Sequence, residues 1–172
     1  MKKLIILALG LVALFAANAL AGDFEYVGAT KCKGCHKAQF TSWSETAHAK
    51  SFDVLSDEEK KDAKCVGCHT TGTTAKEELL EGAQCEACHG PGSAYKSPKI
   101  MGKKLWAADR DAAMKGAMEA GLLVPDEKVC VKCHTKEGNE NFKPFDYAKV
   151  KGTVHPAPAE EAAKEAAPKK TE

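Results

Sequence analysis

Residues 82–99 read GAQCEACHGPGSAYKSPK, and within this stretch Cys85, Cys88 and His89 form a Cys-x-x-Cys-His motif. The same motif occurs three more times, as Cys32-Lys-Gly-Cys35-His36, Cys65-Val-Gly-Cys68-His69 and Cys130-Val-Lys-Cys133-His134. The four copies use all eight cysteines of the 172-residue chain, so none is left for another role.

The spacing within the motif predicts covalent haem. Two residues between the cysteines bring both sulfurs to one side of a single turn, where they can form thioethers with the two vinyl groups of one haem. The next histidine then lies over the iron as its proximal ligand. We therefore predict four covalently bound haem c groups. The predicted proximal iron ligands are His36, His69, His89 and His134.

Two other uses of paired cysteines are weighed against haem. Cys-x-x-Cys pairs also build tetrahedral zinc sites, but zinc does not require a histidine directly after every second cysteine. A disulfide framework is the default for a cysteine-rich exported chain. It does not account for the repeated histidine either.

The N-terminal residues have the pattern of an export signal. Two lysines precede an apolar run, and Ala19-Leu20-Ala21 is the small-x-small pattern of a cleavage site. We predict a signal peptide over residues 1–21, cleaved after Ala21, and a periplasmic protein that is not membrane-embedded. The alternative is an uncleaved anchor, because residues 4–21 approach membrane-spanning length.

The rest of the chain predicts a mostly α fold, with short helices and irregular loops wrapped around the four haems. Phe40, Trp43 and Ala47 recur at helical spacing. Capping boxes at Ser56–Glu59 and Thr74–Glu77 predict two helix starts, the second helix ending at Gly82. The longest helix is predicted over Leu105–Leu123, and no strand pattern is found.

Composition sets the domain boundaries and excludes one class of partner. Residues 22–155 form the predicted tetrahaem cytochrome c domain. Residues 156–172 form a tail of alanine, proline, glutamate and lysine that has little to bury and is predicted to be disordered. The chain has 25 basic and 24 acidic side chains, which does not indicate a nucleic-acid binder.

The number of histidines limits the axial ligands. The chain has six, and four are proximal ligands, which leaves His48 and His155. We predict both as distal ligands of haem iron, the alternatives being a helix-packing and a solvated histidine. A methionine thioether is the next ligand type, and Met101 is the candidate. Less favoured candidates are Met114 and Met118, which fit core packing, and Tyr95, Lys96 and Lys99.

The segments YVGATKCKGCH, SWSETAHAKSF and GAQCEACHGPGS, with the two further motifs, resemble the cytochrome c-554 family of periplasmic tetrahaem proteins. The resemblance covers roughly Tyr26–His155. It implies that His48 is the distal ligand of the third haem, that His155 serves the fourth, and that the second haem is five-coordinate. The family usually has a histidine for the first haem shortly after GPGS, where this chain has residues 95–99. The first haem is then ligated by Met101 or open.

The predicted function is periplasmic, respiratory electron transport between redox proteins. By resemblance, the partners are a multihaem oxidoreductase and a membrane-associated cytochrome or quinone-linked complex. Lysines near the first two motifs suit acidic partners, although a solvated charged surface explains them as well.

Two alternatives are weighed against electron transport. One is a redox enzyme or binder of nitric oxide, nitrite, hydroxylamine or peroxide at an open haem. Catalysis needs nearby proton donors, and the chain has no spare histidine and a single arginine, Arg110. The other is a haem filament with uniform bis-histidine ligation. Exchange of histidine ligands between identical chains cannot raise the number of ligands per haem. A filament with uniform bis-histidine ligation is therefore not supported.

Overall fold

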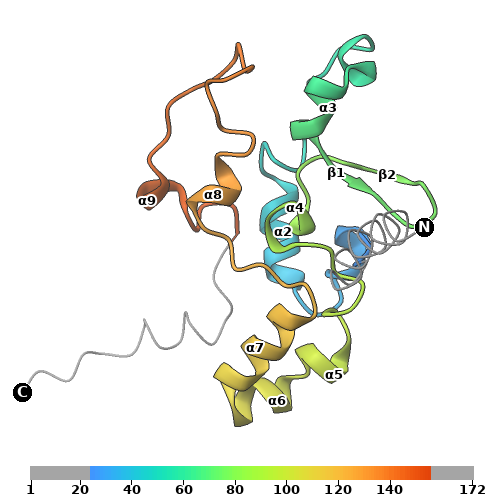
Figure 1. Cartoon of the computed structure of the whole chain (residues 1–172), viewed down its shortest axis with the longest axis vertical. Helices are drawn as coiled ribbons and strands as arrows, with labels where there is room; N and C mark the ends of the chain where they lie inside the picture. The colour runs from blue at the N-terminus through green and yellow to red at the C-terminus, as the bar shows by residue number, and fades with distance from the viewer. Residues whose placement is uncertain (1–23, 156–172) are drawn as a thin grey trace, which may run out of the picture.

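A computed structural model describes residues 24–155 of the chain (Figure 1). The predicted signal peptide and C-terminal tail lie outside the described residues. No helix within residues 24–155 is both long and apolar enough to cross a membrane.

The described part of the chain consists of short helices joined by irregular loops, which confirms the predicted fold class. The longest of these helices, α7, has ten residues. The helices are η2 (Ala29–Lys31), α2 (Lys37–Ser44), η3 (Glu59–Lys61), α3 (Ala63–His69), α4 (Cys85–His89), α5 (Pro98–Met101), α6 (Lys103–Ala108), α7 (Arg110–Glu119), α8 (Glu127–Cys130) and α9 (Tyr147–Val150).

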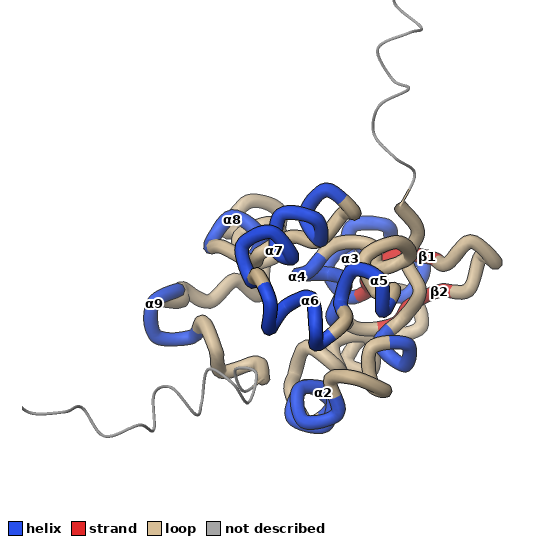
Figure 2. Tube along the Cα trace, turned by 90° about the horizontal axis from the view of Figure 1, so that it is seen from below, coloured by secondary structure: helices blue, strands red, loops and turns tan. Residues whose placement is uncertain are grey.

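Helices α5, α6 and α7 contact one another and form one end of the body, while α3 lies at the other end (Figure 1). Helices α2 and α4 lie between these ends, and Figure 2 shows the same body from below. Long loops carry the chain through α8 and α9 along one side. The predicted single helix over Leu105–Leu123 is wrong, because the chain breaks at Asp109. Its carboxylate instead accepts a hydrogen bond from the Ala112 N–H and caps α7.

A small hairpin was not expected from the sequence. Strands β1 (Thr70–Thr73) and β2 (Leu79–Glu81) pair antiparallel. The predicted helix from Thr74 to Gly82 is therefore wrong. Glu77 has a φ of 61°, outside the α-helical region, and lies in the turn that joins the strands. Short, threonine-rich strands stabilised by their pairing leave little signal in the sequence.

The other predicted capping box is confirmed. The Ser56 N–H donates to the Glu59 carboxylate at 2.7 Å, and the Glu59 N–H donates to Ser56 Oγ at 3.3 Å. The helix that follows is the 3₁₀ turn η3, and α3 begins shortly after it. Both lead the chain to the second motif.

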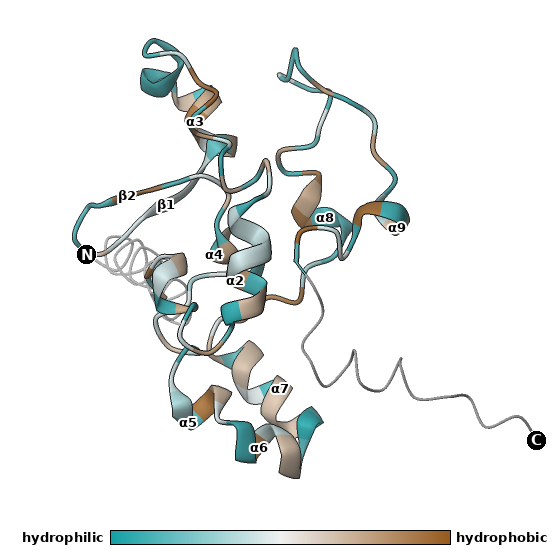
Figure 3. Ribbon diagram, turned by 180° about the vertical axis from the view of Figure 1, so that it is seen from behind, coloured by the Kyte–Doolittle hydropathy of each residue, from teal (hydrophilic) through white to brown (hydrophobic). Residues whose placement is uncertain are grey.

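Few apolar side chains are buried by the polypeptide alone. Figure 3 shows apolar residues scattered over several helices rather than gathered in one layer. Helices α2, α3, α5, α6, α8 and α9 contain no buried residue. The buried apolar residues of the described chain are Ala29, Phe52, Leu55, Tyr95 and Ala117. A core of this size is too small to stabilise a body of this length by itself.

Hydrogen bonds join the hairpin to the segment that contains His48. The Ala83 N–H donates to the His48 carbonyl at 2.9 Å, and Trp43 Nε1 donates to the Ala83 carbonyl at 2.9 Å. The Thr71 hydroxyl donates to the Gly82 carbonyl and accepts from the Gln84 N–H. These bonds fix the backbone of His48 next to the start of the third motif.

We expect Gly82→Ala to lower the free energy of unfolding of the holoprotein by about 1 kcal/mol or more. Gly82 has a φ of 78°, and a Cβ there would lie 2.6 Å from the Ala49 carbonyl oxygen. Thermal unfolding followed by circular dichroism measures the effect. The control is Gly116→Ala within α7, where a Cβ meets nothing within 4 Å. This change should stabilise the protein by about 0.5–1 kcal/mol. Equal melting temperatures for the two variants would contradict the described packing of Gly82.

Candidate haem sites

Each motif forms a helical turn. The second motif lies within α3, and the third is α4 itself. In the first motif the His36 N–H donates to the Cys32 carbonyl at 3.0 Å, and in the fourth the His134 N–H donates to the Cys130 carbonyl at 2.9 Å. Residues i, i+3 and i+4 of a turn share one face, so both cysteines and the histidine face the same side. This is the arrangement that haem c attachment needs.

The cysteines of different motifs meet in pairs. Cys32 is within hydrogen-bonding contact of Cys85, and Cys68 is within hydrogen-bonding contact of Cys133. The Cys85 contact raises the pKa of the free Cys32 thiol, and burial raises that of Cys133 to about 12. Cys88 interacts electrostatically with Cys130. The motifs are therefore neighbours in the order first, third, fourth, second.

The donor set fits haem iron better than a bare metal ion. All eight cysteines are free thiols, with no disulfide among them. Within residues 24–155, no group of three or more His, Cys, Asp or Glu side chains is arranged to hold a metal ion. Haem iron already has four porphyrin nitrogens and takes only one or two protein ligands.

Two proximal histidines have their rings oriented by the backbone. His69 Nδ1 hydrogen-bonds to the Ser51 carbonyl, and His89 Nδ1 lies 3.3 Å from the Leu123 carbonyl oxygen. A metal-bound histidine characteristically donates its second ring N–H in this way, which fixes the tautomer and directs Nε2 at the metal. The orientation of His69 and His89 is therefore the one that a proximal ligand needs.

Histidine rings form two close pairs. The ring centroids of His48 and His134 are 5.9 Å apart, and those of His89 and His155 are 6.1 Å apart. With metal–nitrogen bonds of about 2 Å on both sides, two imidazoles on one iron have centroids roughly 6 Å apart. Both separations match bis-histidine ligation. The two pairs contain the proximal histidines of the fourth and third motifs.

This pairing differs from the one implied by resemblance. The resemblance implies that His48 serves the third haem and His155 the fourth. The structure places His48 beside the fourth motif and His155 beside the third. Which motif each histidine meets depends on how the loops before and after α8 return to the body. The local sequence contains no signal for that.

Burial favours the ligand form of these imidazoles. Burial lowers the pKa of His36, His48 and His89 from the ordinary value of histidine. The charge of His155 lowers the pKa of His36 further, so these two rings lie within electrostatic range. Neutral imidazole is the form that binds iron, so these shifts favour ligation.

The region proposed to serve the first haem differs from expectation in two residues. Met101 ends α5 and is half-buried, so it lies in a helix and not in a loop. Tyr95 is buried, and its hydroxyl donates to the Gly90 carbonyl at 2.8 Å. The phenol is thus engaged with the backbone after the third motif.

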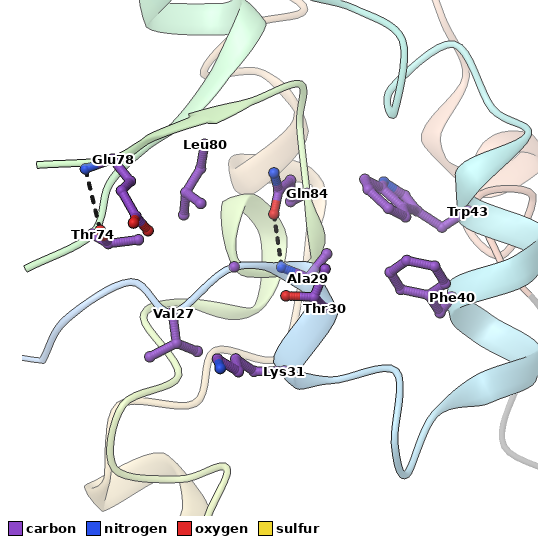
Figure 4. Close-up of a pocket in the computed structure, with 11 residues that line it drawn as sticks. Val27, Ala29, Thr30, Lys31, Phe40, Trp43, Thr74, Glu78, Leu80 and Gln84 are labelled. Atoms are coloured by element: carbon purple, nitrogen blue, oxygen red, sulfur yellow. Dashed lines mark hydrogen bonds between the residues drawn. The ribbon is translucent and has the colours of Figure 1, made fainter. Parts of the chain in front are cut away.

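A cleft of about 340 Å³ lies beside the first motif (Figure 4). Phe40 and Trp43 of α2 border it on one side, and Thr74, Glu78 and Leu80 of the hairpin border it on the other. Its lining contains no cysteine and no histidine, so we assign it no part in holding haem.

Sequence reasoning missed one residue of the sites, Glu86, which is only 1% exposed. The available signal was its position: a carboxylate stands between the two cysteines of one motif, where the other motifs have glycine, valine or lysine. Its contacts are described below.

The fold and the motif turns together define a c-type multihaem cytochrome. A family model described as "Cytochrome c554 and c-prime" matches residues 31–90. Cytochrome c-554 of Nitrosomonas europaea is 40% identical over 89 residues, which cover 40% of this chain and 38% of that protein. The solved structure of reduced cytochrome c554 from Nitrosomonas europaea matches with a TM-score of 0.52 and 26% identity, over 84% of both chains. Over these residues the chain is similar to the cytochrome c-554 family.

The sequence match is partial, since the chain spans about 38% of the length of the curated relative that it matches. The structural match extends further along both chains.

We expect His48→Ala to convert one low-spin iron of the oxidised holoprotein to high-spin, because it removes one of two imidazoles from that iron. Electron paramagnetic resonance counts both spin states. In a background with Cys130→Ala and Cys133→Ala, which lacks the fourth haem, the same substitution should leave the numbers of low-spin and high-spin irons unchanged. His155→Ala is the control and should remove a low-spin signal in both backgrounds. Loss of a further low-spin iron on adding His48→Ala to that background would show that His48 serves another haem.

Proposed function

We propose that this protein is a periplasmic tetrahaem c-type cytochrome that carries electrons between redox proteins. The observation that carries the proposal is that the four motifs are neighbours in series: Cys32 contacts Cys85, Cys88 interacts electrostatically with Cys130, and Cys133 contacts Cys68. Cofactors attached at these sulfurs adjoin one another in the order first, third, fourth, second. Such a series suits electron transfer through one small protein.

Haem c, when bound, supplies one-electron chemistry between ferrous and ferric iron. The chain supplies attachment, ligands and spacing. Eight cysteines hold the cofactors, and His36, His69, His89 and His134 provide the proximal nitrogens. The backbone carbonyls of Ser51 and Leu123 orient two of these rings. No substrate-binding group is needed for this function.

The ligand sets are proposed to differ among the four haems. His48 is proposed as the distal ligand of the fourth haem iron and His155 as that of the third, which the ring pairs support. The remaining proximal histidines, His36 and His69, belong to neither ring pair. The second haem is proposed to be five-coordinate, and the first to be open or ligated by Met101. Unequal ligation gives the irons different reduction potentials.

Redox partners are proposed to dock near the first two motifs. Lys31, Lys33 and Lys37 are exposed beside the first motif, and Lys61 and Lys64 beside the second. These positive charges suit an acidic surface and would speed association at low salt. A multihaem oxidoreductase and a membrane-associated cytochrome or quinone-linked complex are the partner classes that we propose.

Export is part of the proposal. Residues 1–21 are proposed as a signal peptide cleaved after Ala21, residues 22–155 as the tetrahaem domain, and residues 156–172 as a disordered tail. A periplasmic location agrees with the proposed cofactor, because haem c occurs in exported cytochromes.

A second candidate function is binding or conversion of a small nitrogen or oxygen ligand at an open haem. The position of His36 and His69 outside the ring pairs favours it. Conversion would also require proton donors placed at the open iron. We rank electron transfer first, because the arrangement of the four motifs as neighbours in series serves that function directly.

The proposed function predicts a holoprotein that begins at Gly22 and contains four haems, which intact mass spectrometry measures. Electron paramagnetic resonance of the oxidised form should show two bis-histidine irons and at least one high-spin iron. Carbon monoxide should bind the reduced protein at the open iron. Nitrite, hydroxylamine and peroxide should show no steady turnover. Four bis-histidine signals from monomers would contradict the ligand assignment, and turnover would favour the second function.

A further inference from the structure

Glu86 is a buried carboxylate that haem attachment does not explain. It lies between Cys85 and Ala87 in the third motif, where the motif accepts any residue. Its side chain is 1% exposed, the most buried large side chain within residues 24–155. Burial of a charged group is costly unless hydrogen bonds compensate, so a residue kept in this environment needs a physical reason.

The carboxylate accepts hydrogen bonds from three backbone N–H groups. Oε1 accepts from Gly92 at 2.6 Å and from Val27 at 3.0 Å. Oε2 accepts from Gly28 at 2.7 Å and from Val27 at 3.1 Å. All the partners are donors. An ionised carboxylate only accepts and therefore matches them, whereas a glutamine amide would turn its NH₂ group toward one of these N–H groups.

These contacts join two segments that are far apart in the sequence. Val27 and Gly28 precede the first motif, Glu86 is inside the third, and Gly92 follows it. Gln84 adds a parallel bond, since its Oε1 accepts from the Ala29 N–H at 2.7 Å. Just beyond this set of bonds, Cys32 of the first motif contacts Cys85 of the third. The carboxylate thus fixes the first and third motifs against each other.

The packing around the carboxylate is close. A Cβ at Gly92 would lie 3.0 Å from Glu86 Oε1 and 3.3 Å from Val27 Cγ2. Gly28 has a φ of 83°, in the region that favours glycine. Both glycines allow the backbone N–H groups to approach the carboxylate closely.

No ion pair between Glu86 and a cationic side chain is found within residues 24–155. The ion pairs found within residues 24–155 are Lys115–Glu119 and Lys149–Asp146, and neither includes Glu86. Its partners are neutral N–H groups. A buried charge without a counterion acts on neighbouring charges more strongly than an exposed one, because little water screens it.

We propose that Glu86 is a positioning residue that holds the first and third haem motifs together and lowers the reduction potential of the haem attached to Cys85 and Cys88. The inference rests on the proposed function, since it assigns a role toward a bound haem. Ferric haem has one more positive charge than ferrous haem. A fixed negative charge beside the attachment site therefore stabilises the oxidised state.

The test compares Glu86→Gln and Glu86→Asp with Glu127→Gln in the holoprotein. Glu127 begins α8, three residues before Cys130, and is exposed, so it is a matched carboxylate near another motif. Spectroelectrochemical titration gives the haem potentials, and thermal unfolding gives stability. We expect Glu86→Gln to raise at least one potential, while Glu86→Asp keeps the potentials near those of the unsubstituted protein. Both should lower the melting temperature, and Glu127→Gln should change neither quantity.

A loss of stability in Glu86→Gln with every potential unchanged would overturn the electrostatic role. If that variant does not mature, Gln84→Glu provides an independent test, because it adds a negative charge to the same set of bonds. This substitution should lower the potential of the same haem, and unchanged potentials would again overturn the proposal. Failure of the proposed function is distinguishable, because the unsubstituted protein would then show no haem potentials, or would turn over nitrite, hydroxylamine or peroxide, and neither result depends on Glu86.

Discussion

The polypeptide of this protein buries too little apolar surface to stabilise its own fold, and the rest of the structure depends on this constraint. Five apolar residues are buried in the described chain, and most of its helices bury none. Folding must offset a large loss of conformational entropy. We propose that covalent haem supplies the apolar surface that the side chains do not, and that thioethers hold each haem without a deep pocket.

A fold of this kind relies on polar contacts between segments. The residues before the third motif are joined to the His48 segment by the bonds of Trp43 and Ala83, and to the hairpin by those of Thr71. The first motif is joined to the third through Glu86. These contacts determine where the cofactors lie relative to one another. Spacing and ligation are the properties that an electron carrier requires, so the same hydrogen bonds that stabilise the fold also serve the function.

The features that the sequence predicts correctly are local. The motif turns and the Ser56–Glu59 capping box each depend on residues within five positions of one another, so their chemistry is visible in the sequence. The hairpin, the break at Asp109 and the partners of His48 depend on contacts between distant segments, and the first two contradicted the expected helices. Glu86 was missed for the same reason, because its donors lie before the first motif and after the third.

The most direct measurement of the central claim is the folding of the chain without haem. Residues 22–172 can be produced in the cytoplasm, where haem c is not attached, and compared with the exported holoprotein. Two-dimensional NMR of backbone amides and thermal unfolding report the fold. We expect the haem-free chain to show poorly dispersed signals and no cooperative transition. Dispersed signals with a cooperative transition near that of the holoprotein would contradict the account, because the polypeptide would then provide its own core.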